Sequence, residues 1–265
     1  MTKKFIAGGC SFTFGHELSD DDNGKTPSKK TWAHGLMPEG DTYICTASPG
    51  SGNSGIARRI FQAITSSEPT EIRGVVIMWT LLSRYDWAMP RHNALENTRW
   101  ASISPWDTAK MQDHVYHRLS KSKAQQDLWK GRIARMKETG VSPFAEAIYK
   151  HGANQYHETY LSWKSIIWIQ HILEKRKIPY MFTLADNTLF YNEFKEHKNT
   201  DGLMGALYSE IDKSKWFSFG DRMMGFNQWA TINDYEYATT HPLDKAHEDA
   251  VQLMLPTFNK LIGDR

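Results

Sequence analysis

Apolar residues recur along the chain in two alternating patterns: short unbroken runs, and stripes with helical spacing. The unbroken runs cover residues 4–8, 43–46, 74–82 and 178–184, and we interpret them as buried strands. Three stripes predict helices, through Ile56, Ile60, Phe61 and Ile64, through Leu161, Ile166, Ile169 and Leu173, and through Ala246, Ala250, Leu253 and Met254. Strands that alternate with helices predict a layered α/β fold with a mainly parallel sheet. Pro256 is expected to kink or restart the last helix.

The stretch from about residue 86 to 155 interrupts this alternation. It is rich in Trp, Arg, His and Lys, and residues 108–138 look mostly helical. We predict a largely helical insertion that covers the functional edge of the sheet, within a single domain that spans residues 1–265.

Composition narrows the classes of protein that the chain can belong to. It has 265 residues, is 40% hydrophobic, and carries a formal net charge of +2, which does not imply a nucleic-acid partner. Two cysteines exclude a disulfide framework and suit a reducing compartment. The apolar run near the start is too short for a signal peptide, and nothing later resembles a membrane span. We therefore expect a soluble cytoplasmic protein without a membrane partner.

The first strand delivers a small hydroxyl residue into a glycine-rich turn. Gly8 and Gly9 precede Cys10 and Ser11, just past the carboxyl end of the strand. In a parallel sheet, this edge is where functional loops gather. A glycine-rich turn between a strand and a helix can also bind phosphate or simply reverse the chain, so the turn by itself leaves the function of Ser11 open.

Three motifs and one strand stand in an order that resembles a known superfamily. They are "GCSFTFG" at 9–15, "ASPGSGN" at 47–53, the apolar third strand with its polar loop, and "THPLDKAHEDA" at 240–250. In this order they resemble the SGNH (GDSL-type) hydrolases, in particular divergent phage-encoded members with a GCSFT-type opening. The resemblance covers Lys4 to about Leu261 without the insertion. It implies a three-layer, flavodoxin-like sandwich and a serine ester hydrolase.

The resemblance assigns Ser11 as the nucleophile, with Cys10 where the family usually has Asp. A serine hydroxyl needs an adjacent base to become nucleophilic near neutral pH, and His241, in the His-Pro pair, matches that base. His241 could instead cap the last helix or pack on Pro242. His247 is expected to be structural.

The acid that the family places three residues before this histidine is missing, because Ala238 occupies the position. A nearby carboxylate or a backbone carbonyl can orient the imidazole in its place. Candidate carboxylates are Asp234, Glu236 and Asp244.

Acyl transfer also needs hydrogen-bond donors for the oxyanion. The resemblance implies the Ser11 N–H and the Gly50 N–H, with Gly52 as a second choice. Both glycines could equally just form the turn before the helix. The family's third donor is an Asn, but this chain has "WTLLSR" at the expected place, so Thr80 or Asn53 is a substitute. Asn53 could equally be a helix N-cap. Further candidates for lining the substrate pocket are Cys10, Trp79 and Arg84, although a Trp is usually buried and an Arg usually lies on the surface.

Three functions remain open at this point. The first is an SGNH-like esterase that acts on an acetyl or other acyl group of a small molecule, a carbohydrate or a lipid-like substrate, without a cofactor. The second is a catalytically decayed SGNH-like binding or virion-associated module. The third, an enzyme of nucleic-acid metabolism, depends on basic and aromatic residues that could equally form a solvated helix face: Arg91, Arg99, Trp106, Trp129, Lys130, Arg132, Arg135 and Lys137. The histidines are scattered, and only His114 and His117 form a loose pair, so no metal is expected.

Overall fold

Four parallel strands form the central sheet, in the order β2–β1–β3–β6. The computed structural model describes residues 2–22, 24–89, 99–119, 123–191 and 202–263. The strands are β1 Lys4–Gly8, β2 Thr42–Cys45, β3 Ile72–Trp79 and β6 Tyr180–Leu184. All four were predicted from the apolar runs. However, β3 ends three residues before the predicted end, because the backbone N–H and C=O of Thr80 pair with the Asn53 side chain instead of a strand.

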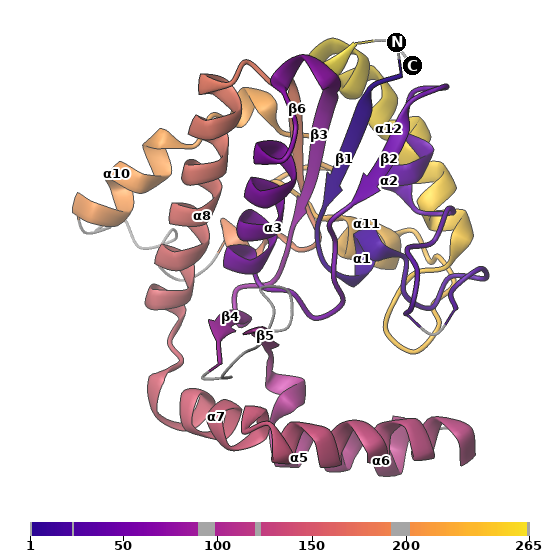
Figure 1. The fold of residues 1–265 in the computed structure, drawn as a ribbon, viewed down its shortest axis with the longest axis vertical. Helices are drawn as coiled ribbons and strands as arrows, with labels where there is room; N and C mark the ends of the chain where they lie inside the picture. Colours follow the sequence, from indigo (N-terminus) through magenta and orange to yellow (C-terminus); the bar gives the residue numbers. More distant parts are fainter. Residues whose placement is uncertain (1, 23, 90–98, 120–122, 192–201, 264–265) are drawn as a thin grey trace.

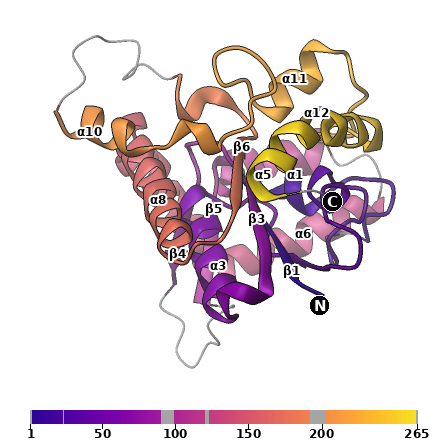
Figure 2. The same cartoon turned by 90° about the horizontal axis from the view of Figure 1, so that it is seen from above.

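Helices cover both faces of this sheet (Figures 1 and 2). One face carries α3 Asn53–Thr65 and α8 Gln155–Lys175, with α10 Gly202–Glu210 against α8. The other carries α2 Trp32–Gly35, α11 Phe226–Ile232 and α12 Asp244–Ile262. Alternate residues of β3 point to the two sides: Val75 and Ile77 into the α3/α8 core, Val76 and Met78 into the α12 core. The predicted three-layer α/β sandwich is confirmed.

One detail of the predicted helices is wrong. Phe61 and Leu253 are 37% and 46% exposed, so neither belongs to the buried stripe of its helix. Phe61 instead packs on the Trp168 ring at the protein surface, with ring centroids 5.0 Å apart. The last helix is continuous through Pro256, which excludes a restart there, and the kink stays a prediction. Burial of Phe258 and Ile262 beyond the proline offsets the lost backbone hydrogen bond.

The segment between β3 and α8 lies at the carboxyl ends of the strands (Figure 1). It begins with a hairpin, β4 Tyr85–Ala88 and β5 Trp100–Ile103, that was not predicted. Its strands have four residues each and are largely unburied, so they lack an apolar run. The helices that follow are α5 Ala109–His114, α6 Lys123–Glu138 and α7 Val141–Ala147. A π-helical segment, Val115–Leu119, continues directly from α5. The predicted helical insertion is therefore present, while the single-domain organisation stays a prediction.

The hairpin docks onto α3 through a salt bridge. Asp86 of β4 accepts from Nε and Nη2 of Arg58 at 2.8 and 3.3 Å. Gly55 allows this approach, because a Cβ at that position would lie 2.7 Å from Oδ1 of Asp86. The insertion also has its own small core, which includes Tyr85, Ile103 and Ala145.

None of the helices in the described ranges is both long enough and apolar enough to cross a membrane.

Candidate active site

Ser11 is the first residue of a short helix, α1 Ser11–Phe14, that starts where β1 ends. Gly9 makes the turn possible, because a Cβ there would lie 2.1 Å from Oγ1 of Thr13. The chain leaves α1 through Gly15, whose φ of 83° is left-handed. Strand, tight turn and helix together hold the Ser11 hydroxyl at the carboxyl edge of the sheet, where it is 5% exposed.

His241 lies against Ser11, as the sequence predicted. Its Nε2 is 2.7 Å from Oγ of Ser11, although 230 residues separate the two. The loop that carries His241 leads directly into α12, and the imidazole packs edge-on against the Phe12 ring with centroids 5.0 Å apart. The nucleophile candidate and the base candidate therefore form a buried hydrogen bond.

The other nitrogen of this imidazole contacts a carboxylate that sequence analysis missed. Nδ1 of His241 is 2.7 Å from Oε2 of Glu17, which also accepts from the Thr240 backbone N–H at 3.0 Å. Burial opposes ionisation of Glu17, but the hydrogen bonds from His241 and Thr240 prevail and lower its pKa to about 2. Because an ionised carboxylate only accepts, Nδ1 carries the proton and Nε2 is left to accept from the Ser11 hydroxyl.

A left-handed backbone conformation places Glu17 behind the imidazole. Its φ is 71°, which is uncommon for a residue with a side chain, and its N–H donates to Oδ2 of Asp21 at 2.9 Å. The only sequence signal for this role is an acid in the loop directly after α1, at the carboxyl edge of the sheet. The motif that the sequence resembles does not include an acid six residues after the serine, so it could not point to Glu17.

None of the predicted replacement acids is hydrogen-bonded to His241 in the described ranges. Asp244 instead accepts from Ser19 and Lys30, and these bonds lower its pKa to about 2 against the effect of burial. Neither Asp234 nor Glu236 is bonded to the imidazole in the part of the chain that the structure describes. At position 238 the backbone N–H of Ala238 closes the turn by donating to the His241 carbonyl at 2.9 Å. The expectation that Asp234, Glu236 or Asp244 supplies the acid is wrong, because Glu17 already fills the position.

The loop with the candidate oxyanion glycine borders the Ser11 turn. Its Ser48 N–H donates to the Gly9 carbonyl at 3.2 Å. Gly50 has a φ of 78°, and its role as an oxyanion donor stays a prediction. Gly52 has a packing reason to be glycine, since a Cβ there would lie 2.4 Å from the Arg84 carbonyl oxygen.

Asn53 fastens the end of β3 to two helices and has no amide group left for an oxyanion. Its Oδ1 accepts from the Thr80 N–H at 2.8 Å, and its Nδ2 donates to the Thr80 carbonyl at 3.1 Å and to Oγ of Ser162 at 3.0 Å. Both expectations for Asn53 are wrong: the N-cap of α3 is Gly52, and the Asn53 side chain is buried among structural partners.

Three further predicted site residues are fully buried. Trp79 packs edge-on against Phe182 in the core, and Cys10 lies in the opposite core, so neither can line a substrate pocket. The Thr80 hydroxyl is 3.3 Å from Sγ of Cys10 and accepts from Nη1 of Arg84, which removes it as an oxyanion donor. Arg84 is only half-buried, and its role in a pocket stays a prediction.

His247 and the basic residues of the insertion take structural or solvated positions. His247 is buried and accepts from the Trp32 backbone N–H through Nδ1, as expected of a structural histidine. On α6 the side chains of Lys130, Arg132, Arg135 and Lys137 are exposed, and Arg91 lies outside the described residues. No group of three or more His, Cys, Asp or Glu side chains suited to a metal ion occurs within the described ranges.

No protein-family model matches the sequence, and no curated protein matches it. Several solved structures are similar over nearly the whole chain. A member of the lipolytic G-D-S-L family from Veillonella parvula is 11% identical, covers 98% of this chain and 100% of its own, and has a TM-score of 0.44. A GDSL-like lipase from Bacteroides thetaiotaomicron is 12% identical, with coverages of 97% and 88% and a TM-score of 0.43. A catalytic mutant of an acetylxylan esterase from Geobacillus stearothermophilus is 10% identical, with coverages of 100% and 97% and a TM-score of 0.45. Similarity at this level leaves the activity to be inferred from the site.

Proposed function

We propose that this protein is a serine ester hydrolase of the SGNH type, which cleaves an acyl group such as acetate from a small-molecule or carbohydrate alcohol. The observation that carries the proposal is the buried hydrogen-bonded series Ser11–His241–Glu17. Nucleophile, base and acid are connected in the order that activates a serine hydroxyl. A serine that is only structural does not need an imidazole whose other nitrogen is bonded to an ionised carboxylate.

The proposed reaction has two halves. Ser11 Oγ attacks the acyl carbon while Nε2 of His241 takes the hydroxyl proton, and the same proton passes to the alcohol oxygen as the ester C–O bond breaks. Water then attacks the acyl-serine, gives a proton to Nε2, and releases the carboxylic acid as the proton returns to Oγ. Glu17 stays ionised throughout and stabilises the imidazolium that forms in each half.

Backbone groups are the proposed oxyanion donors. The Ser11 N–H lies in the first turn of α1, where no intrahelical acceptor exists. The Gly50 N–H belongs to the loop that is bonded to Gly9. The Thr80 and Asn53 side chains are occupied by structural hydrogen bonds, so we assign no side-chain donor to the oxyanion.

Only one of the two observations that favoured a decayed binding module still favours it. It followed from Ala238 in place of the acid and from the missing Asn after the third strand. Glu17 supplies an acid from the other end of the chain, so only the missing Asn favours the alternative.

Hydrolysis of 4-nitrophenyl acetate by the purified chain and by two serine variants tests the proposal. We expect wild-type turnover, and a loss of kcat/KM by about 10⁴-fold or more in Ser11→Ala. Ser66→Ala is the matched control, because Ser66 is an exposed serine at the end of α3 whose hydroxyl donates to the Gln62 carbonyl. Turnover that survives in Ser11→Ala, or none in the wild type with this and other acyl esters, contradicts the proposal.

A further inference from the structure

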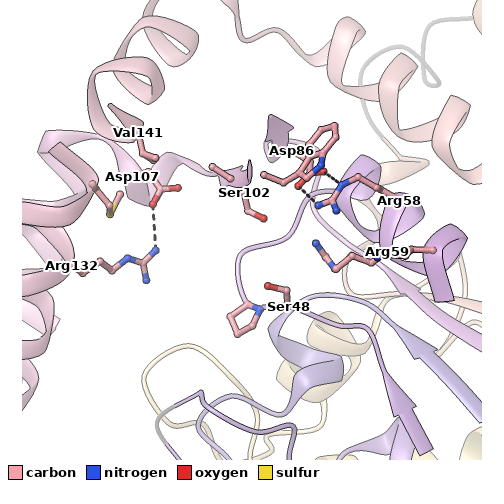
Figure 3. A pocket seen from close by; sticks show the side chains of 13 residues that line it. Ser48, Arg58, Arg59, Asp86, Ser102, Asp107, Arg132 and Val141 are labelled. Atoms are coloured by element: carbon pink, nitrogen blue, oxygen red, sulfur yellow. Dashed lines mark hydrogen bonds and ion pairs between the residues drawn. The ribbon is translucent and has the colours of Figure 1, made fainter. Parts of the chain in front are cut away.

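A cavity of about 400 Å³ lies between α3, the loop after β2 and the insertion (Figure 3). Ser48 and Pro49 line it on the side of the sheet, Arg58 and Arg59 on the side of α3, and Ser102 on the hairpin. Its size is in the range of pockets for small organic ligands. None of Ser11, His241 and Glu17 lines it.

The charged groups of the cavity do not balance. Three arginines and two aspartates line it. Arg58 is paired with Asp86 and Arg132 with Asp107, at 2.8 and 3.3 Å. Arg59 is therefore left with the surplus positive charge.

Among the residues that the structure describes, Arg59 donates only to neutral acceptors. Its Nε donates to the Thr46 carbonyl at 2.8 Å, and its Nη2 donates to Oγ of Ser51. These two bonds fix one edge of the guanidinium. Within the described ranges Nη1 has no partner, and in Figure 3 the side chain reaches from α3 toward Ser48 and Ser102. Since a guanidinium carries five N–H donors, its terminal edge can still bind two oxygens of an anion side by side.

The partly buried environment of Arg59 favours binding of an anion. Burial lowers the pKa of Arg59 to about 10, with the charge of Asp86 acting against this and that of Arg58 adding to it. The group is thus still charged at neutral pH, and it lies where water solvates it poorly. A partly desolvated cation gains more from an anionic ligand than one in bulk water.

The cavity adjoins the Ser11 turn through the backbone. Thr46, whose carbonyl holds Arg59, donates its N–H to the Ala7 carbonyl at 2.8 Å, and Ser48 donates to Gly9 at 3.2 Å. The loop that borders the cavity is therefore fixed to the residues that lead into Ser11. A ligand in the cavity would touch Ser48, whose backbone is bonded to Gly9, two residues before Ser11.

We propose that this cavity binds an anionic group of the substrate, so that the preferred substrate is an acyl ester of an alcohol that bears one carboxylate or phosphate group, held by Arg59. The inference rests on the proposed esterase function and names its substrate class. The Ser48 and Ser102 hydroxyls supply neutral hydrogen bonds around the anion, and Arg58 and Arg132 remain occupied by their own aspartates.

Three acetate esters with matched rings test the inference: phenyl acetate, 4-acetoxybenzoate and 4-acetoxyphenyl phosphate. We expect Arg59→Gln to lower kcat/KM about 10- to 100-fold for at least one anionic ester, with phenyl acetate changed less than about 3-fold. The ester that loses most identifies carboxylate or phosphate as the group bound. Arg59→Lys keeps the charge without the paired donors and should fall between the wild type and Arg59→Gln.

Arg176→Gln is the matched control. Arg176 is also bonded to a neutral acceptor, the Ser67 carbonyl at 2.8 Å, but it follows α8 at the opposite edge of the sheet. It should leave all three rates unchanged. An equal fall in kcat/KM for all three esters in Arg59→Gln would show that Arg59 only supports the loop. If kcat/KM does not fall selectively for at least one anionic ester, the inference is overturned.

Binding to an inactive protein separates this inference from the proposed function. In Ser11→Ala, calorimetry should detect 4-hydroxybenzoate or phenyl phosphate, and not phenol, and adding Arg59→Gln should weaken that binding about 10-fold or more. Binding that depends on Arg59, without any ester hydrolysis by the wild type, supports the anion site in the cavity and contradicts the proposed esterase function. Ester hydrolysis with binding that does not depend on Arg59 supports the esterase and contradicts the cavity.

Discussion

The Glu17 carboxylate lies 2.7 Å from Nδ1 of His241, across 224 residues of chain. The motif that the sequence resembles implies an acid three residues before the histidine, and this chain has Ala238 at that position. The acid is instead on the loop after α1, so Ser11 and Glu17 belong to one short segment whose spacing is fixed by α1 and Gly15. The histidine is the one member of the series that comes from the other end of the sequence.

Glu17→Gln should lower kcat by about 10⁴-fold with little change in KM. The amide is neutral, so it cannot stabilise the imidazolium, and its NH₂ group can donate to Nδ1 and hold the wrong tautomer. Steady-state kinetics with 4-nitrophenyl acetate measure the effect. Glu236→Gln is the control, because Glu236 lines the same surface cavity as Glu17 without bonding to His241. Activity of Glu17→Gln within about 10-fold of the wild type would exclude Glu17 as the acid.

Asn53→Ala should lower the free energy of unfolding by about 2–4 kcal/mol, because it leaves the Thr80 N–H and C=O and the Ser162 hydroxyl without their partner. Urea unfolding measures this loss. Asn233→Ala, which removes one side-chain bond to the Trp229 carbonyl, should cost about 0.5–1.5 kcal/mol. An Asn53→Ala protein that is fully stable but inactive would make Asn53 an oxyanion donor after all.

Gly9→Ala should destabilise the protein more than Gly50→Ala does. At Gly9 a methyl group meets Thr13 at 2.1 Å and the Met78 carbonyl oxygen at 3.3 Å, so the turn before Ser11 has to shift, which costs about 1–3 kcal/mol or more. At Gly50 the methyl group meets nothing within 4 Å, and only the left-handed φ of 78° opposes it, at about 1–2 kcal/mol. Thermal unfolding of the two variants compares them, and the reverse order would contradict the packing at Gly9.

His247 should make the stability fall as the pH drops below 6.5. Burial, together with the charge of His241, lowers its pKa from 6.5 to about 3. Between these values the unfolded chain binds a proton that the folded protein does not, so the free energy of unfolding decreases with falling pH by up to about 1.4 kcal/mol per unit. Between pH 6.5 and 4.5 this effect precedes the titration of Glu17, whose stabilising charge is lost only as the pH falls from 4.5 toward 2.

Urea unfolding at pH 6.5 and 4.5 measures this slope. His247→Asn keeps an acceptor for the Trp32 N–H and should flatten it, whereas His171→Asn, at an exposed position on α8, should leave it as in the wild type. An unchanged slope in His247→Asn would mean that His247 is charged in the folded protein.

The sequence predicted the sheet well because β1, β3 and β6 are buried on both faces and therefore read as apolar runs. The edge strand β2 is only partly buried, but it is also a short apolar run. The β4–β5 hairpin escaped prediction because its short strands are largely unburied. Ser11 and His241 could be found from motifs, since each belongs to a local pattern. Glu17 and the partners of Asn53 could not, because they are defined by contacts between distant segments: a left-handed residue against the loop before α12, and an α3 side chain against Thr80 and Ser162.

Covalent labelling with diisopropyl fluorophosphate tests the central claim, that His241 and Glu17 activate the Ser11 hydroxyl. The reagent phosphorylates an activated serine and releases fluoride, and intact-mass measurement followed by peptide mapping locates the adduct. We predict one adduct, on Ser11, which is lost in Ser11→Ala and slowed strongly in His241→Ala. A folded protein that gains no adduct, or gains one at another residue, would contradict the account.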